Sequence, residues 1–187
     1  MLSYLVSDLY IHPVKSLKSV SLSEAEIDEF GFVHDRRFML VDASGKFISQ
    51  RKHSRLGFLS AEFDGRNLVI QGKGLDAITF ALSEFEVALE VDVWADRVGA
   101  LAIADERTEK LSEYIGLMLS LVYMPRSTFR QVDREFFSAD QKLSFADAFP
   151  FLLTNTASLD DLNDKLEQPI GMGRFRPNIV FTGDQPF

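Results

Sequence analysis

The sequence predicts a mainly β fold with an α+β C-terminal part, and three observations support this prediction. Short apolar runs separated by turn residues fill the first half of the chain. The strongest alternation lies in residues 86–94, EVALEVDVW, where Val87, Leu89, Val91 and Val93 share one parity. Farther along, apolar residues recur at helical spacing in two segments. The length of 187 residues suits one large or two small domains.

The N-terminal part is expected to consist of short strands joined by tight turns. The predicted strands cover residues 3–11, 19–28, 36–42, 46–51, 58–63, 67–72, 77–82 and 85–95. Gly45 in DASG and Gly65 in DGR lie where hairpin turns require a positive φ. Strands at this spacing are typical of a barrel or a sandwich. Trp94 and most of the phenylalanines are expected in the core.

Two helices are expected in the C-terminal part. Residues 105–119 carry apolar side chains at helical spacing, with Asp105 as the N-cap. Residues 158–171 form the second helix, in which Ser158 and Asp161 have the spacing of a capping box.

Strands and one long polar loop complete the C-terminal part. The predicted strands cover residues 120–125, 150–156 and 174–183. Residues 126–149 show no clean periodicity and are interpreted as a loop of the kind that covers a site. The chain thus divides into an all-β first part and an α/β or α+β second part, with the boundary between about residues 100 and 125.

Composition excludes several classes of site. The chain has no cysteine, so it holds no disulfide, zinc–thiolate site, iron–sulfur cluster or cysteine nucleophile. The three histidines lack metal-ligand spacing, and no metal-binding residue is predicted.

A net charge of −8 argues against nucleic-acid binding. Without a membrane-length apolar stretch or a signal peptide, the expected location is cytoplasmic, with no membrane partner.

Basic and polar groups gather at the ends of the predicted elements. Residues 34–55 contain six Lys or Arg against two acids, in an otherwise acidic chain. Arginine forks and helix N-termini bind phosphate oxygens, so converging groups of this kind would form a phosphate or oxyanion pocket. The alternatives are a basic sheet face, a solvated corner lysine and an ordinary helix cap. The candidates are Lys15, Ser16, Arg36, Arg37, Arg51, Lys52, Asn155, Ser158, Arg174 and Arg176.

Several stretches together resemble the MOSC-domain proteins that carry an N-terminal β-barrel domain, in the style of bacterial relatives of the mitochondrial amidoxime-reducing component. The resemblance is ordered and covers nearly the whole chain. It is carried by IHPVKSL (11–17), GFVHDRRFMLVD (31–42), ISQR (48–51), PFLLTNTASLDDLN (150–163) and RFRPNIV (174–180).

The resemblance implies a MOSC N-terminal β-barrel domain over residues 1–120, followed by the first, incomplete part of a MOSC domain over residues 121–187. It also implies that the molybdenum cofactor binds between them. This cofactor is molybdopterin, a pterin with a terminal phosphate. No catalytic side chain is assigned. The residues matched to cofactor-facing positions are Lys15, Ser16, Arg37, Asp147, Asn155, Ser158, Arg176 and Asn178.

For a longer parent protein, the resemblance implies a molybdenum-dependent oxidoreductase that reduces small N-hydroxylated compounds. A ferredoxin-like domain or protein would supply the electrons. The family's molybdenum ligand is a cysteine beyond the RPN strand, which this chain lacks. We therefore expect a truncated and inactive portion of the enzyme. The alternatives are a sulfur-carrier or sulfurtransferase protein and a non-enzymatic β-barrel binding module.

Overall fold

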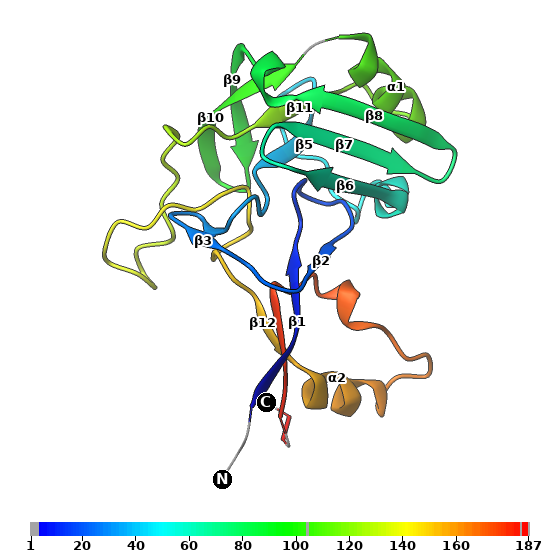
Figure 1. Ribbon diagram of the computed structural model, residues 1–187, viewed down its shortest axis with the longest axis vertical. Coiled ribbons are helices and arrows are strands. Elements are labelled where there is room, and N and C mark those ends of the chain that lie inside the picture. Colours follow the sequence, from blue (N-terminus) through cyan, green and yellow to red (C-terminus); the bar gives the residue numbers. More distant parts are fainter. Residues whose placement is uncertain (1–3, 104, 184, 187) are drawn as a thin grey trace.

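β-strands dominate the computed structural model, which describes residues 4–103, 105–183 and 185–186 (Figure 1). The strands are β1 (Leu5–Ile11), β2 (Val20–Leu22), β3 (Ile27–Asp28), β4 (Gly31–Phe32), β5 (Phe38–Asp42), β6 (Leu59–Phe63), β7 (Asn67–Gly72), β8 (Leu75–Ala81), β9 (Val87–Val93), β10 (Asp96–Ile103), β11 (Leu119–Tyr123), β12 (Leu153–Asn155) and β13 (Ile179–Thr182). The helices are α1 (Glu106–Ile115) and α2 (Thr156–Asn163), with 3₁₀ turns η1 (Ser54–Phe58), η2 (Leu82–Glu84) and η3 (Met172–Arg174). The prediction of a mainly β fold with a smaller helical part is confirmed.

Antiparallel sheets form the upper part of the molecule in Figure 1. One sheet has the order β5-β11-β10-β9, and another has the order β6-β7-β8. The strands β3 and β4 pair separately. Closure of these sheets into a barrel stays a prediction.

A third sheet joins the two ends of the chain. Its order is β12-β13-β1-β2, in which β1 pairs antiparallel with both β13 and β2. The strand β12 runs parallel to β13. The first strand of the predicted N-terminal domain is therefore hydrogen-bonded to the last strand of the predicted C-terminal domain. The boundary at residue 120 itself stays a prediction.

The core is divided by β5, which is buried on both faces. Phe38 and Leu40 belong to one hydrophobic cluster, and Met39 and Val41 belong to the other. Successive side chains of a strand point to opposite faces, so continuous apolar sequence is expected for a strand covered on both sides. This buried strand fixes the residues just before it, where the candidate site begins.

The structure corrects several predictions of elements. The single strand predicted at residues 19–28 is two strands, β2 and β3, which pair with β1 and β4 respectively. Residues 46–51 form only the isolated bridges Val41–Phe47 and Lys46–Asp92 rather than a strand. The strand β10 was not among the predicted strands. The second helix spans Thr156–Asn163 rather than residues 158–171. It begins before Ser158 because the Asn155 side chain caps it by accepting a hydrogen bond from the Ala157 N–H.

The N-cap prediction at the first helix is confirmed. Asp105 has extended backbone angles and accepts from the Arg107 N–H, and Gly116 ends the helix in the left-handed region. Within the described part of the chain, no helix is both long and apolar enough to cross a membrane. The cytoplasmic location stays a prediction.

Candidate functional site

The corner that follows β1 is buried and pinned to β5. The Lys15 N–H donates to the Phe38 carbonyl at 2.8 Å, and the Phe38 N–H donates to the Pro13 carbonyl at 3.0 Å. The His12 N–H donates to Asp35 at 2.7 Å. Burial, with nearby arginines, lowers the pKa of His12 to about 2, so the ring is neutral at physiological pH. The corner is therefore a fixed structural feature rather than a solvated turn.

A cavity of about 580 Å³ opens beside this corner. Its walls come from segments far apart in sequence: residues 15–16, 36, 47–51, 94, 146–152 and 173–178. Five cationic side chains line it against a single carboxylate, that of Asp147, among the described residues. In a chain with a net charge of −8, this local excess of positive charge favours an anionic ligand.

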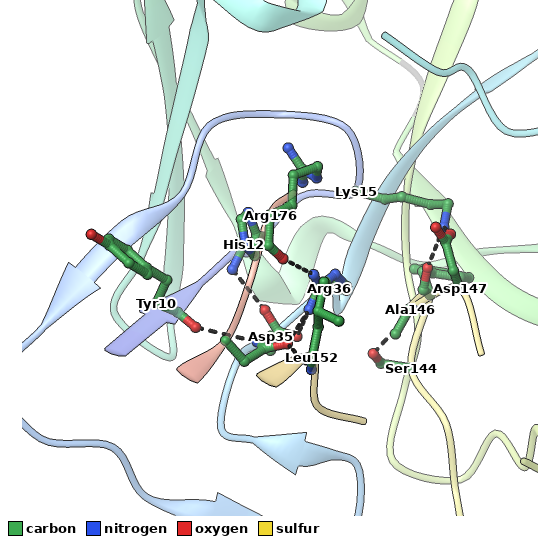
Figure 2. Close-up of polar contacts among 12 residues, drawn as sticks. Tyr10, His12, Lys15, Asp35, Arg36, Ser144, Ala146, Asp147, Leu152 and Arg176 are labelled. Atoms are coloured by element: carbon green, nitrogen blue, oxygen red, sulfur yellow. Dashed lines mark hydrogen bonds and ion pairs between the residues drawn. The ribbon is translucent and has the colours of Figure 1, made fainter. Parts of the chain in front are cut away.

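Lys15 reaches across the cavity to the 144–149 loop (Figure 2). Its ammonium donates to the Phe145 carbonyl at 2.7 Å and forms an ion pair with Asp147. The Trp94 indole N–H donates to the same carboxylate at 3.0 Å. Burial lowers the pKa of Lys15 to about 8, although the charge of Asp147 opposes this shift. Lys15 is thus a buried cation whose charge depends on one exposed carboxylate.

Arg36, and not Arg37, faces the cavity. The Arg36 guanidinium pairs with Asp35, donates to Asn178 Oδ1 at 3.0 Å and donates to the Arg176 carbonyl at 3.0 Å (Figure 2). Arg37 points the other way: it donates to a backbone carbonyl at the end of β11 and lies 4.1 Å from the centre of the Phe30 ring. Arg37 therefore does not line this cavity, since the left-handed backbone of Arg36 (φ 51°) directs the two side chains apart just before β5. The assignment of Arg37 to the cofactor stays a prediction.

Arg176 has one unused nitrogen inside the structure. Its Nη1 donates to the Leu17 carbonyl. Its Nη2 is buried and has no hydrogen-bond partner among the described residues. Burial and the nearby charge of Arg36 lower the pKa of Arg176 to about 10, so the guanidinium remains charged at neutral pH. A buried donor without an acceptor is costly, and a bound anion would satisfy it.

The remaining predicted residues divide between the cavity and the fold. Asn178 lines the cavity, but its side chain is occupied by Arg36, by the Leu152 N–H at 3.2 Å and by the Tyr10 carbonyl at 3.2 Å. Asn155 and Ser158 do not line the cavity. Asn155 caps α2 and donates to the Gln185 carbonyl at 2.8 Å. The sequence candidates that the structure brings to the cavity are Lys15, Ser16, Arg36, Arg51, Asp147, Arg174, Arg176 and Asn178.

Aromatic side chains of the cavity wall were missed from the sequence. Trp94 was expected in the core, but it is 50% exposed and lines the cavity. It lies in the two-residue turn between β9 and β10. Because β10 was not predicted from the sequence, this turn was not predicted either. Phe149 and Phe175 are exposed cavity residues as well.

Strained backbone is concentrated at the cavity. Of the five non-glycine residues with positive φ in the described ranges, four line it: Ser16 (71°), Arg36 (51°), Trp94 (58°) and Arg176 (58°). Each such conformation costs on the order of 1–3 kcal/mol and persists only where its surroundings hold it. This clustering supports the cavity as the functional site.

Comparisons with known proteins agree with the resemblance seen in the sequence. A family model described as the MOSC N-terminal beta barrel domain matches residues 3–118, and one described as the MOSC domain matches residues 140–187. Mitochondrial amidoxime-reducing component 1 is 28% identical over 195 residues in Xenopus laevis, and 30% identical over 193 residues in Homo sapiens. Molybdenum cofactor sulfurase of Oryza sativa subsp. japonica is 28% identical over 207 residues.

These matches cover nearly all of this chain but only part of each relative. They include 98% of this chain and 57% of the Xenopus protein, and 95% of this chain and 56% of the human protein. For the rice sulfurase the shares are 97% and 25%. The chain thus spans a little over half the length of the amidoxime-reducing relatives.

Proposed function

Because this chain belongs to the family of proteins with a MOSC N-terminal β-barrel domain, we propose that its cavity binds the phosphate-bearing pterin of the molybdenum cofactor. The observation that carries this proposal is the unpartnered Nη2 of Arg176 in a cavity with five cationic side chains. The name of the sulfurase relatives, molybdenum cofactor sulfurase, refers to the same cofactor.

The donor set fits a phosphate group. We name the buried end of the cavity, formed by Lys15, Ser16, Arg36, Arg176 and Asn178, the inner corner. Arg176 and Lys15 supply charged N–H donors, and Ser16 supplies a hydroxyl. A phosphate offers several acceptor oxygens, so it matches this number of converging donors better than a carboxylate does.

Arg36 and Asn178 would act by positioning rather than by contact. Both terminal nitrogens of Arg36 already donate hydrogen bonds within the protein. Nη1 donates to Asn178 Oδ1, and Nη2 donates to the Arg176 carbonyl. Asn178 ties the inner corner to β1 and to the segment before β12. This network fixes the strained backbone of Arg176, and with it the position of the guanidinium beside the cavity.

In the whole protein, the proposed reaction is two-electron reduction of small N-hydroxylated compounds, with electrons from a ferredoxin-like domain or protein. When bound, the cofactor supplies the redox chemistry at molybdenum. The inner corner binds and orients the cofactor, and the aromatic wall excludes water. Since this chain has no cysteine, it offers molybdenum no thiolate, and we expect the 187-residue chain alone to be inactive.

The similarity to molybdenum cofactor sulfurase supports a second candidate, a sulfur-transfer role. Both candidates use the same cofactor-binding corner. They are separated by assaying the whole protein for hydroxylamine reduction and for sulfur transfer. A non-enzymatic binding module is the outcome if neither activity is found and the cavity binds no pterin.

The binding proposal is tested by pterin content. The chain is purified from cells that make the cofactor, the bound pterin is oxidised, and its fluorescence is quantified per mole of protein. Arg176→Gln is expected to lower the pterin content at least tenfold, because it removes the charged donor inside the inner corner. The matched control is Arg66→Gln, at an exposed arginine outside the cavity. Equal pterin content in the two variants, or none in the unmodified chain, contradicts the proposal.

A further inference from the structure

The cavity has a second part with different chemistry from the inner corner. Its outer edge carries Arg51, Trp94, Phe149, Arg174 and Phe175, and all five side chains are exposed. We name this set the rim. The inner corner is mostly buried and polar, whereas the rim combines two arginines with three aromatic rings.

The guanidinium groups of the two rim arginines are free of polar partners in the described part of the chain. Neither Arg51 nor Arg174 has a side-chain hydrogen bond or ion pair with any residue that the structure describes. By contrast, the guanidinium of Arg36 is held by three groups. In a chain with a net charge of −8, two arginines left without carboxylate partners at a cavity mouth point to an anion from outside the chain.

Trp94 prepares Arg51 for this role. The Arg51 guanidinium carbon lies 5.7 Å from the centre of the Trp94 ring, within the range of a cation–π contact. A cation–π contact leaves the N–H groups of the guanidinium available to donate hydrogen bonds, and a guanidinium can donate to both oxygens of a carboxylate.

The indole itself is fixed on three sides. Its N–H donates to Asp147 at 3.0 Å, and its ring lies 4.9 Å from that of Phe47 in an edge-on contact. Its backbone is held at φ 58° in a two-residue hairpin turn, where glycine is the usual residue. Trp94 keeps this unfavourable backbone conformation although its side chain is half exposed. We therefore interpret it as a residue of the cavity wall rather than as one that stabilises the hairpin.

We propose that the rim is a recognition subsite for planar aromatic molecules that carry a carboxylate, with Arg51 as the anchor and Trp94 as its positioning residue. The rings of Phe149 and Phe175 supply apolar contact for the aromatic part. This inference rests on the proposed function in one respect: the molecule recognised is taken to be the N-hydroxylated substrate. The preferred substrates are then aromatic amidoximes or hydroxylamines with an acidic substituent.

The test is a binding titration of the 187-residue chain, which needs neither the cofactor nor an electron donor. Trp94 is the only tryptophan, so its fluorescence reports directly on the rim. The probes are 4-carboxybenzamidoxime, neutral benzamidoxime and the cyclohexane analogue of the carboxylated probe. The carboxylated aromatic probe is expected to bind at least fivefold more tightly than either of the others. Equal affinity for all three, or no binding, overturns the proposal.

Variants locate the carboxylate. Arg51→Gln is expected to raise the Kd of the carboxylated probe about fivefold and to abolish its advantage over the neutral probe, while Arg66→Gln changes neither. A larger loss in Arg176→Gln than in Arg51→Gln would place the carboxylate in the inner corner and overturn the proposal. Since the probe has no phosphate, this result is independent of the pterin content that tests the proposed function.

The positioning role of Trp94 has its own readout. Trp94→Gly suits the positive φ of the turn and removes the ring, and its affinity is measured by calorimetry. If the indole acts through Arg51, Trp94→Gly weakens binding as Arg51→Gln does, the double variant is no weaker than Arg51→Gln, and Trp94→Phe restores part of the affinity. Additive losses in the double variant would show that the indole does not act through Arg51.

Discussion

At the scale of single residues, burying the charged side chain of Lys15 is unfavourable for folding. Its side chain is 7% exposed, and burial lowers its pKa from the ordinary 10.5 to about 8. Between those values the unfolded chain holds a proton that the folded chain has released. Stability must therefore rise with pH across this window, because the unfolded state binds more protons. A buried lysine of this kind is expected where a site needs a cation close to an anionic ligand.

Lys15→Met should remove that pH dependence. The difference in unfolding free energy, unmodified chain minus variant, is expected to increase from pH 8 to pH 10.5 by roughly 3 kcal/mol at most. Urea unfolding at several pH values measures it. Lys18→Met, at an exposed lysine of the same corner, is the control and should give a flat difference. A flat difference for Lys15→Met as well would show that Lys15 is not buried in solution.

Residue-level reasoning from the sequence located the inner corner but not all of its geometry. Lys15, Ser16 and Arg176 were recognised because strand ends with cationic or hydroxyl groups are typical of anion sites. The resemblance assigned Arg37 to the cofactor, whereas Arg36 lines the cavity; which of the two faces it depends on the positive φ of Arg36, which no local pattern predicts. Asn178 was assigned to the cofactor, whereas its side chain is taken up by neighbouring segments.

At the scale of elements, the sequence correctly predicted the strand with the clearest alternation and the helix with a recognisable N-cap. The strand β9 follows the 86–94 pattern, and α1 begins after Asp105 as expected. The predicted strand at residues 46–51 is reduced to isolated bridges, because this segment divides its pairing between the free edge of β5, at Val41, and β9, at Asp92. Such competition between partners is decided by tertiary structure and leaves no local signal.

The start of α2 offers a direct test of the corrected cap. Asn155 is buried and accepts from the Ala157 N–H at 3.1 Å, whereas Ser158 lies inside the helix. Asn155→Ala should lower the free energy of unfolding by about 1–2 kcal/mol, in the range of a lost N-cap. Ser158→Ala should cost less than Asn155→Ala, because Ser158 lies inside the helix, where alanine is favoured, and does not cap its start. Urea unfolding of both variants measures this; a larger cost for Ser158→Ala would restore Ser158 as the cap.

At the scale of the whole molecule, the cavity exists because distant segments meet. The sheet that pairs β1 with β13 brings the N-terminal corner beside the arginine segment near the C-terminus. The 144–149 loop then reaches Lys15 and Trp94 through Asp147. The sequence motifs indicated which residues carry charge, but only the antiparallel register of β1 and β13 places them around one cavity. This explains why the predicted set was partly right and why the aromatic rim was missed.

Asn178 is the point where this arrangement can be tested, because its buried side chain joins three parts of the chain. It accepts from Arg36 and Leu152 and donates to Tyr10. Asn178→Ala removes one hydrogen bond from each of these groups and should cost roughly 2–4 kcal/mol. If the sheets unfold as one unit, the urea midpoint falls equally by Trp94 fluorescence, which reports on the β9–β10 turn, and by far-UV circular dichroism. The control Asn163→Ala loses only local bonds to Ile170 and should cost less. A shift seen by circular dichroism but not by fluorescence would mean that the β1–β13 sheet unfolds separately, and that the cavity opens before the rest of the fold is lost.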